Sequence, residues 1–223
     1  MIFQKVGKNF CALSYIYPGH TKTETNETWE SNWLAAQHRS LQFIKLTKRN
    51  YYVITGGPGA GKTSLLENLA AKGYHYIPEA AREIIRERLS QGLTPRPGPK
   101  IFAKQIFDQD WKNFISNSDS SSVVFFDRSF MDSACMLFDS DPDSHDMISN
   151  FLLSHRYNNK VFITPPWKEI YRNDAERDQS FEQSIEVYER LDKWYKQHGY
   201  DIVVLPKDTL ENRVRFILDE IAS

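Results

Sequence analysis

The sequence predicts an α/β fold in which a five-stranded parallel sheet is flanked by helices on both faces. Two observations support this fold class. Short apolar, β-rich runs alternate with helical patterns five times between residue 51 and the C-terminus. One of these runs, 122–127, is continuously apolar before its final acid, as expected of a central strand that is buried on both faces.

The expected elements follow one another along the chain, with loops at the breaks. The strands are expected over residues 51–55, 74–78, 122–127, 160–164 and 202–206. Helices are expected where apolar residues recur at helical spacing, over residues 62–70, 79–89, 100–115, 130–138, 145–156, 180–197 and 209–221. The proline-rich segment 94–99 and the turn-forming residues 140–143 separate neighbouring helices.

The first 50 residues differ in character from the rest of the chain. A length of 223 residues suits one well-buried domain with an appendage. We therefore expect an N-terminal extension over 1–50, loosely packed or partly helical, and one domain over 51–223. Seven basic and three acidic residues give the extension a net charge of +4, which leaves −5 on the remainder.

The composition argues against several classes of protein. A net charge of −1 gives no overall attraction to nucleic acid or to a membrane surface. No apolar run approaches the ~20 residues that a membrane span needs, and the N-terminus lacks the order of a signal peptide. Cys11 and Cys135 lie far apart in the chain without metal-like spacing, so both are expected to be plain thiols in a cytoplasmic protein. The histidines show no metal-ligand spacing either.

The most specific motif is the segment 56–63, which matches the pattern G-x-x-x-x-G-K-[ST]. Glycines there let backbone N–H groups curl around phosphate oxygens, and the helix that follows points its positive end at them. Lys62 adds an ammonium that should face ligand and solvent, and Thr63 a hydroxyl for Mg²⁺. Cofactor contacts are expected from Gly57, Pro58, Gly59, Ala60, Gly61, Lys62, Thr63 and Ser64. The alternative is a glycine-rich turn that binds nothing, but the flanking strand and helix supply the context of the motif.

Two acids end predicted strands, at the edge where ligands bind in open α/β sheets. Asp127 has the form of the acid that ends a Walker B strand, within reach of a magnesium ion on Thr63, directly or through water. It could also merely cap the helix that follows. Glu79 ends the second strand, but the helical spacing of Glu79, Arg82, Glu83 and Arg86 equally fits an ordinary salt-bridged face.

Most aromatic residues recur at core positions, although Phe107 or Trp111 could stack on a ligand ring.

Five blocks of the sequence carry a resemblance when they are taken together. They are GGPGAGKTSLL, IPEAARE, VVFFDRSFMD, VFITPPWKEIYRNDAERDQSFE and GYDIVVLP. In these blocks the chain resembles the NadR-type AAA family of P-loop ATP-binding proteins, whose relatives include the ribosylnicotinamide kinase domain and, more distantly, deoxynucleoside kinases. The resemblance runs from about Tyr51 to the C-terminus and implies a P-loop NTPase fold of the nucleoside-kinase kind. The arginine-finger and sensor layout of hexameric remodelling ATPases is not recognisable.

The resemblance also implies roles for individual residues. Lys62 would lie at the phosphates, and Glu79 would occupy the position of the carboxylate that takes the proton from the acceptor hydroxyl. Arg128 resembles the arginine of a D/E-R-S element near the substrate phosphate site. Arg172 and Arg177 match lid arginines that close over the transferred phosphoryl group. The alternative for these two is a solvated charged face, since Asp174, Glu176 and Asp178 lie among them.

Together these features predict a magnesium-dependent kinase that uses ATP, with GTP possible, and acts on a small nucleoside-like metabolite. The absence of a guanine-reading N-K-x-D element favours ATP. The alternative is a nucleotide-dependent switch with slow hydrolysis and a protein or lipid partner, for which the basic extension is the only indication. Neither nucleic acid nor a transmembrane segment is expected, and the oligomeric state, the acceptor and the role of 1–50 have no signal in the sequence.

Overall fold

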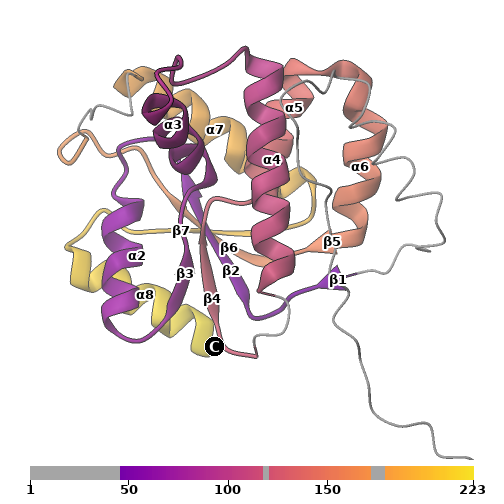
Figure 1. The fold of residues 1–223 in the computed structure, drawn as a ribbon. Helices are drawn as coiled ribbons and strands as arrows, with labels where there is room; N and C mark the ends of the chain where they lie inside the picture. Colours follow the sequence, from indigo (N-terminus) through magenta and orange to yellow (C-terminus); the bar gives the residue numbers. More distant parts are fainter. Residues whose placement is uncertain (1–45, 118–120, 172–178) are drawn as a thin grey trace, which may run out of the picture. The chain divides into compact units, whose positions relative to one another are not determined.

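The structure, a computed structural model, describes residues 46–117, 121–171 and 179–223 (Figure 1). These residues belong to one unit of the chain, Lys45–Ser223. The extension expected over 1–50 lies almost wholly outside the described residues and stays a prediction. Its last residues contribute a short strand, β1 (Leu46–Thr47), which pairs in parallel with β5 (His155–Arg156).

The main sheet has five parallel strands in the order β3-β4-β2-β6-β7. Their bounds are β2 (Tyr51–Gly56), β3 (His75–Ile77), β4 (Val124–Asp127), β6 (Lys160–Thr164) and β7 (Asp201–Val204). The central strand β2 is almost fully buried, with β4 and β6 as its neighbours. The predicted five-stranded parallel sheet is therefore confirmed, and the carboxyl ends of β2, β3 and β4 meet at one edge.

The helices fall close to the expected ranges. They are α2 (Lys62–Ala71), α3 (Ala80–Ser90), α4 (Pro99–Ser116), α5 (Phe130–Ser140), α6 (His145–Ser154), α7 (Phe181–Gln197) and α8 (Leu210–Ala222), with a 3₁₀ turn η1 (Pro142–Ser144) between α5 and α6. The helix expected over 145–156 ends two residues early, because His155 and Arg156 are extended and pair with β1. The backbone partner lies far away in the sequence, so helical spacing alone could not predict this end.

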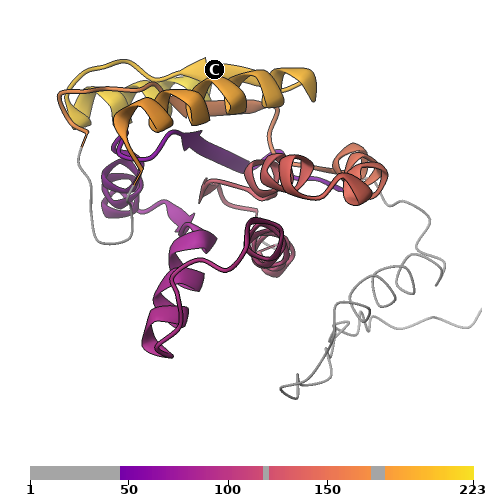
Figure 2. The same cartoon turned by 90° about the horizontal axis from the view of Figure 1, so that it is seen from above.

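Helices lie on both faces of the sheet (Figure 1, Figure 2). One face packs against α2 and α8 through a core cluster of Ile54, Leu65, Leu66, Leu69, Phe125, Phe162, Leu205, Val214 and Ile217. The other face packs through aromatic rings, with Tyr51 of β2 against Phe114 of α4 at 5.4 Å between ring centroids. Tyr51 and Ile54, an odd number of positions apart in β2, thus point to opposite faces of the sheet, as the two-residue period of a strand requires.

Phe107 and Trp111 belong to the aromatic core. Phe107 packs edge-on against Phe151 at 5.0 Å, and Trp111 stacks on Phe114 at 5.5 Å. Phe107 is buried. Phe107 is therefore covered by its aromatic neighbours and does not line the cleft beside the phosphate loop, whereas stacking of a ligand on the partly buried Trp111 stays a prediction.

Two further expectations can be checked on the described residues. Cys135 is a free, buried thiol, and burial raises its pKa to about 12. Such a thiol is uncharged and inert at neutral pH, as expected.

Within 46–117, 121–171 and 179–223, no helix combines the length and apolar character that crossing a membrane demands.

Candidate functional site

The glycine-rich loop joins the central strand to the first turn of α2 and borders a cleft of about 840 Å³. Gly59 and Gly61 have φ angles of 72° and 79°. This is a left-handed backbone conformation that residues other than glycine adopt only with strain. The loop and helix residues that line this cleft are Gly59, Gly61, Lys62, Thr63 and Ser64. The remaining wall comes from Arg82, Trp167, Ile170, Asp208, Thr209, Leu210 and Arg213. We call this space the donor cleft.

Three of the expected contact residues, Gly57, Pro58 and Ala60, lie on the inner side of the loop and are buried. The hydroxyl of Ser184 in α7 donates to the carbonyl oxygen of Pro58 at 2.8 Å. The guanidinium of Arg213 in α8 donates to the carbonyl oxygen of Ala60 at 3.3 Å. The loop is therefore held by the last two helices, by α7 through Ser184 and by α8 through Arg213, which also lines the cleft.

Lys62 differs from its expected exposure. Its side chain is only 2% exposed, and its ammonium donates to the carbonyl oxygens of Gly57 at 2.8 Å and Gly56 at 3.3 Å. The expectation that this side chain faces ligand and solvent is wrong for the structure described, because the curled loop directs two carbonyl groups at the ammonium. Lys62 also lines the donor cleft, so it stands between the loop and that space.

A second, smaller pocket of about 180 Å³ adjoins the donor cleft. It is lined by Thr63, Glu67, Tyr76, Pro78, Glu79, Arg82, Glu83, Arg86 and Asp127, and we call it the acceptor pocket. Thr63 and Arg82 line both spaces. The two spaces therefore meet at these two side chains, next to the phosphate loop.

Thr63 and Asp127, the expected magnesium ligands, both line the acceptor pocket. Asp127 ends β4 opposite Ile54 of the central strand, and it is 5% exposed. In this pocket, a hydroxyl and a carboxylate offer the oxygen ligands that Mg²⁺ prefers. Among the described residues, no group of three or more His, Cys, Asp or Glu could hold a metal ion. One hydroxyl and one carboxylate match the way in which Mg²⁺ is usually held, by one or two protein groups together with water and phosphate oxygens.

Glu79 lies at the carboxyl end of β3 and precedes the first turn of α3. Its carboxylate bridges two arginines: Arg128 Nε donates to Oε1 at 3.0 Å, and Arg82 Nε donates to Oε2 at 3.3 Å. The helical pair of Glu79 with Arg82 is thus present, as the salt-bridged alternative proposed. The second partner, Arg128, directly follows β4 and is far from Glu79 in the sequence. Glu79 therefore links α3 to the end of β4.

Arg128 follows Asp127 in a left-handed backbone conformation, with φ of 66°. Such a conformation is strained for a residue other than glycine, and it is held here by a backbone hydrogen bond from Arg128 N to Ile54 O at 3.1 Å. The side chain bridges Glu79 and Asp132, the latter at 3.1 Å from Nη1. Burial alone would lower the pKa of the Arg128 guanidinium, but the neighbouring carboxylates of Glu79 and Asp132 raise it above its ordinary value. The guanidinium is a fixed charge.

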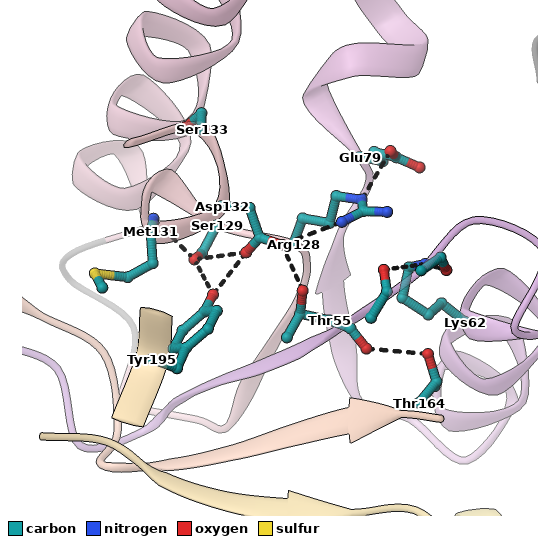
Figure 3. A network of polar contacts seen from close by, with 12 residues as sticks. Thr55, Lys62, Glu79, Arg128, Ser129, Met131, Asp132, Ser133, Thr164 and Tyr195 are labelled. Carbon is teal, nitrogen blue, oxygen red and sulfur yellow. Dashed lines mark hydrogen bonds and ion pairs between the residues drawn. The ribbon is translucent and has the colours of Figure 1, made fainter. Parts of the chain in front are cut away.

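Asp132 anchors the inner end of this assembly, and sequence analysis did not single it out (Figure 3). Its buried carboxylate accepts hydrogen bonds from Thr55 Oγ1, from Ser129 Oγ at 3.3 Å and from Tyr195 OH at 2.6 Å, in addition to Arg128. Burial and the nearby Asp132 carboxylate raise the pKa of Tyr195 well above its ordinary value, so its hydroxyl remains a donor. We refer to Glu79, Arg82, Arg128 and Asp132 as the carboxylate–arginine cluster. Only the position of Asp132, four residues after Arg128, could have indicated the pair.

Arg172 and Arg177 lie outside the described residues, so their lid role stays a prediction. The residues that flank this segment are close together, because the hydroxyl of Tyr171 donates to the carbonyl oxygen of Gln179. The described arginines that line the donor cleft are Arg82 and Arg213, neither of which the sequence assigned to phosphate.

The family comparison matches residues 51–213 to the model described as AAA domain. Among solved structures, deoxyadenosine kinase from M. mycoides with dCMP and dCDP superposes with a TM-score of 0.60 at 16% identity, covering 77% of this chain and 98% of that one. NadR in complex with NR superposes with a TM-score of 0.64 at 15% identity, covering 90% of this chain and 62% of that one. Among curated proteins, none matches the sequence.

The structural similarities are too low in sequence identity to show more than a shared fold. That fold is the helix-flanked parallel sheet with a phosphate loop at the end of its central strand. The family match spans most of the described unit, including the phosphate loop, Glu79 and the Asp127–Arg128 corner. The chain therefore belongs to the AAA domain family of P-loop proteins.

Proposed function

We propose that this protein is a magnesium-dependent kinase that transfers the γ-phosphate of ATP to a hydroxyl of a small nucleoside-like metabolite. The observation that carries the proposal is that Thr63, Asp127 and Glu79 line one pocket beside the phosphate loop. A hydroxyl and a carboxylate suited to magnesium thus adjoin a second carboxylate suited to a base. The shared fold with a deoxyadenosine kinase and with NadR supports the same chemistry.

Thr63 and Asp127 would hold the metal, which neutralises the charge that develops on the phosphate oxygens during transfer. Lys62 would leave the carbonyl groups of Gly56 and Gly57 for the phosphates, since it already borders the donor cleft. Arg172 and Arg177 are proposed to add positive charge from the lid. Positioning and charge are the main requirements of phosphoryl transfer, and these side chains supply both.

Glu79 is the proposed base. The acceptor hydroxyl oxygen bonds to the γ-phosphorus, the bond from that phosphorus to the bridging oxygen of ADP breaks, and the hydroxyl proton passes to the Glu79 carboxylate. Arg82 and Arg128 each donate through Nε to a different oxygen of the Glu79 carboxylate. They also hold it at the border of the acceptor pocket, so that its position does not depend on the substrate.

ATP is the proposed donor and GTP the alternative, because no guanine-reading N-K-x-D element occurs in the sequence. The cytoplasm is the proposed compartment, in keeping with the free Cys135 thiol. The acceptor is proposed to be small, since the acceptor pocket measures about 180 Å³.

The test is an acceptor screen with purified protein, magnesium and either ATP or GTP. One nucleoside or ribosyl metabolite should raise ADP release by orders of magnitude over slow hydrolysis and appear as a phosphorylated product, because water is a poor substitute for a positioned hydroxyl. Glu79→Gln should remove most of the stimulated rate, ~10²–10⁴-fold, with ATP affinity near that of the wild type. A protein that hydrolyses nucleotide slowly, ignores every acceptor and is unaffected by Glu79→Gln would contradict the kinase and favour the nucleotide-dependent switch.

A further inference from the structure

Two arginines hold the Glu79 carboxylate, and they are alike in burial. The side chains of Arg128 and Arg82 are 17% and 19% exposed, and each donates through Nε to a different oxygen of Glu79. They differ in where they lie. Arg128 continues inward to the buried Asp132, and it is not among the described residues that line the donor cleft or the acceptor pocket. Arg82 lines both.

If the protein is a kinase, the junction of the two spaces is where the phosphoryl group is transferred. A phosphoryl group in transfer leaves the donor on one side and joins the acceptor on the other, so it passes through the place where the two sites meet. Among the described residues, Thr63 and Arg82 are the side chains common to both linings. Thr63 is the candidate magnesium ligand, which leaves Arg82 as the cation at that junction.

The charges around the junction favour the same assignment. The acceptor pocket has four carboxylates in its lining, Glu67, Glu79, Glu83 and Asp127, against two arginines, Arg82 and Arg86. An anionic phosphoryl group entering such surroundings is repelled unless a cation meets it. Arg213, the other described arginine of the donor cleft, is engaged with the loop at Ala60 O.

We propose that Arg82 is a catalytic residue that contacts the γ-phosphoryl group at the junction of donor cleft and acceptor pocket. The proposal rests on the proposed kinase function and adds a phosphate-binding cation from α3 to the lid arginines. Glu79 has a second role in this arrangement, since it accepts the hydrogen bond from Arg82 Nε and so fixes the orientation of the planar guanidinium. Arg128 and Asp132 fix Glu79 and so act as positioning residues.

Nucleotide binding tests the contact without any acceptor. In the presence of magnesium, calorimetry would give the Kd of ADP and of a non-hydrolysable ATP analogue for the wild type, Arg82→Ala and Arg88→Ala. Arg82→Ala should keep ADP affinity within about twofold and lower the preference for the analogue about tenfold, because a charge-assisted hydrogen bond to the γ-phosphate is lost. Arg88→Ala is the matched control: it lies on the same helix, lines neither space and donates to the carbonyl oxygen of Thr94, so the preference should not change.

Arg82→Gln is the second variant, in case alanine disturbs folding. Glutamine can still donate to Glu79 but lacks the charge, so it should show the same loss of preference. An unchanged preference in both Arg82 variants, or an equal fall in Arg88→Ala, would overturn the proposal. If an acceptor has been found, stimulated kcat should fall ~10²–10³-fold in Arg82→Gln, in line with removal of a charge that stabilises the transition state. A failed acceptor screen would contradict the kinase function. The binding comparison would still show whether Arg82 contacts the γ-phosphate, because it needs no acceptor.

Discussion

The phosphate loop and the carboxylate–arginine cluster both contact helix α7, but through opposite kinds of contact. Where the loop packs against α7 it is held by small uncharged residues, since the backbone of Gly57 lies close to Ser184 and the carbonyl group of Pro58 accepts the hydrogen bond of the Ser184 hydroxyl. The cluster is held by charged side chains, with Asp132 as a buried anion that several donors share. The loop should therefore be sensitive to added atoms and the cluster to lost charge.

Helix α7 supports both regions. Its first half holds the loop through Ser184, and its second half holds the cluster through Tyr195 (Figure 3). A single helix therefore contacts both the phosphate loop and Asp132 of the cluster. The contrast between neutral and charged support can therefore be tested by substitutions in the loop, in the cluster and along this one helix.

The largest effect is expected for Asp132→Ala. The substitution leaves the guanidinium of Arg128 with only one of its two carboxylates and removes the acceptor of Thr55 and Tyr195. Breaking a buried ion pair by removing one partner destabilises a protein by ~3–5 kcal/mol, and we expect a loss of this size in the free energy of unfolding by urea. If the proposed kinase activity is found, its acceptor-stimulated rate should fall as well, because Arg128 then holds Glu79 less firmly.

Asp139→Ala is the matched control for Asp132→Ala. Asp139 lies on the same helix and pairs with Arg190, but both side chains are about half exposed. An exposed ion pair contributes at most about 1 kcal/mol, so this variant should unfold near the wild-type urea concentration. Equal losses in the two variants would show that the cluster is no more than an ordinary surface network.

Gly57→Ala tests the loop and should have the next largest effect. A methyl group at this position would overlap both the hydroxyl and the carbonyl oxygen of Ser184, so the loop or α7 has to move. Overpacking of this kind destabilises by ~1–3 kcal/mol, and the displaced N–H groups should weaken ATP binding measured by calorimetry. Gly98→Ala is the control, since a Cβ there meets nothing within 4 Å. Normal ATP affinity in Gly57→Ala would mean that the loop tolerates added volume.

The two regions also differ in how far the sequence could predict them. The loop is contiguous, so its motif, its strand and its helix could all be recognised together, and β6 was predicted at its observed bounds. The cluster joins residues 49 positions apart at Glu79 and Arg128 and 63 apart at Asp132 and Tyr195. Only the topology of the sheet brings these together. The burial of Lys62 was missed for a related reason, because it depends on the direction of two loop carbonyl groups.

Tyr195→Phe removes the hydroxyl that donates to Asp132 of the cluster, while the aromatic ring stays packed in place. A hydrogen bond to a charged group contributes ~1.5–3 kcal/mol, so the free energy of unfolding should fall by about 2 kcal/mol. The loss should shrink as pH rises above 10. The pKa of Tyr195 is raised in the folded state, so the hydroxyl ionises first in the unfolded chain, and this stabilisation is full below pH 10 and declines above it. Urea titrations of both proteins at pH 8 and pH 10.5 measure the difference, and other titrating groups cancel between them.

Ser184→Ala is the neutral counterpart on the same helix and should have the smallest effect. The hydroxyl donates to the carbonyl oxygen of Pro58, an uncharged acceptor, and such a bond contributes ~0.5–1.5 kcal/mol. The closest approach at Gly57 involves the carbonyl oxygen of Ser184 as well as its hydroxyl, so alanine leaves much of the backbone contact in place. We therefore expect a loss of about 1 kcal/mol that is the same at pH 8 and pH 10.5, with ATP affinity reduced less than in Gly57→Ala. A loss in Ser184→Ala that equals or exceeds that of Tyr195→Phe would contradict the contrast, because it would mean that side-chain hydrogen bonding, and not close backbone packing, holds the loop against α7.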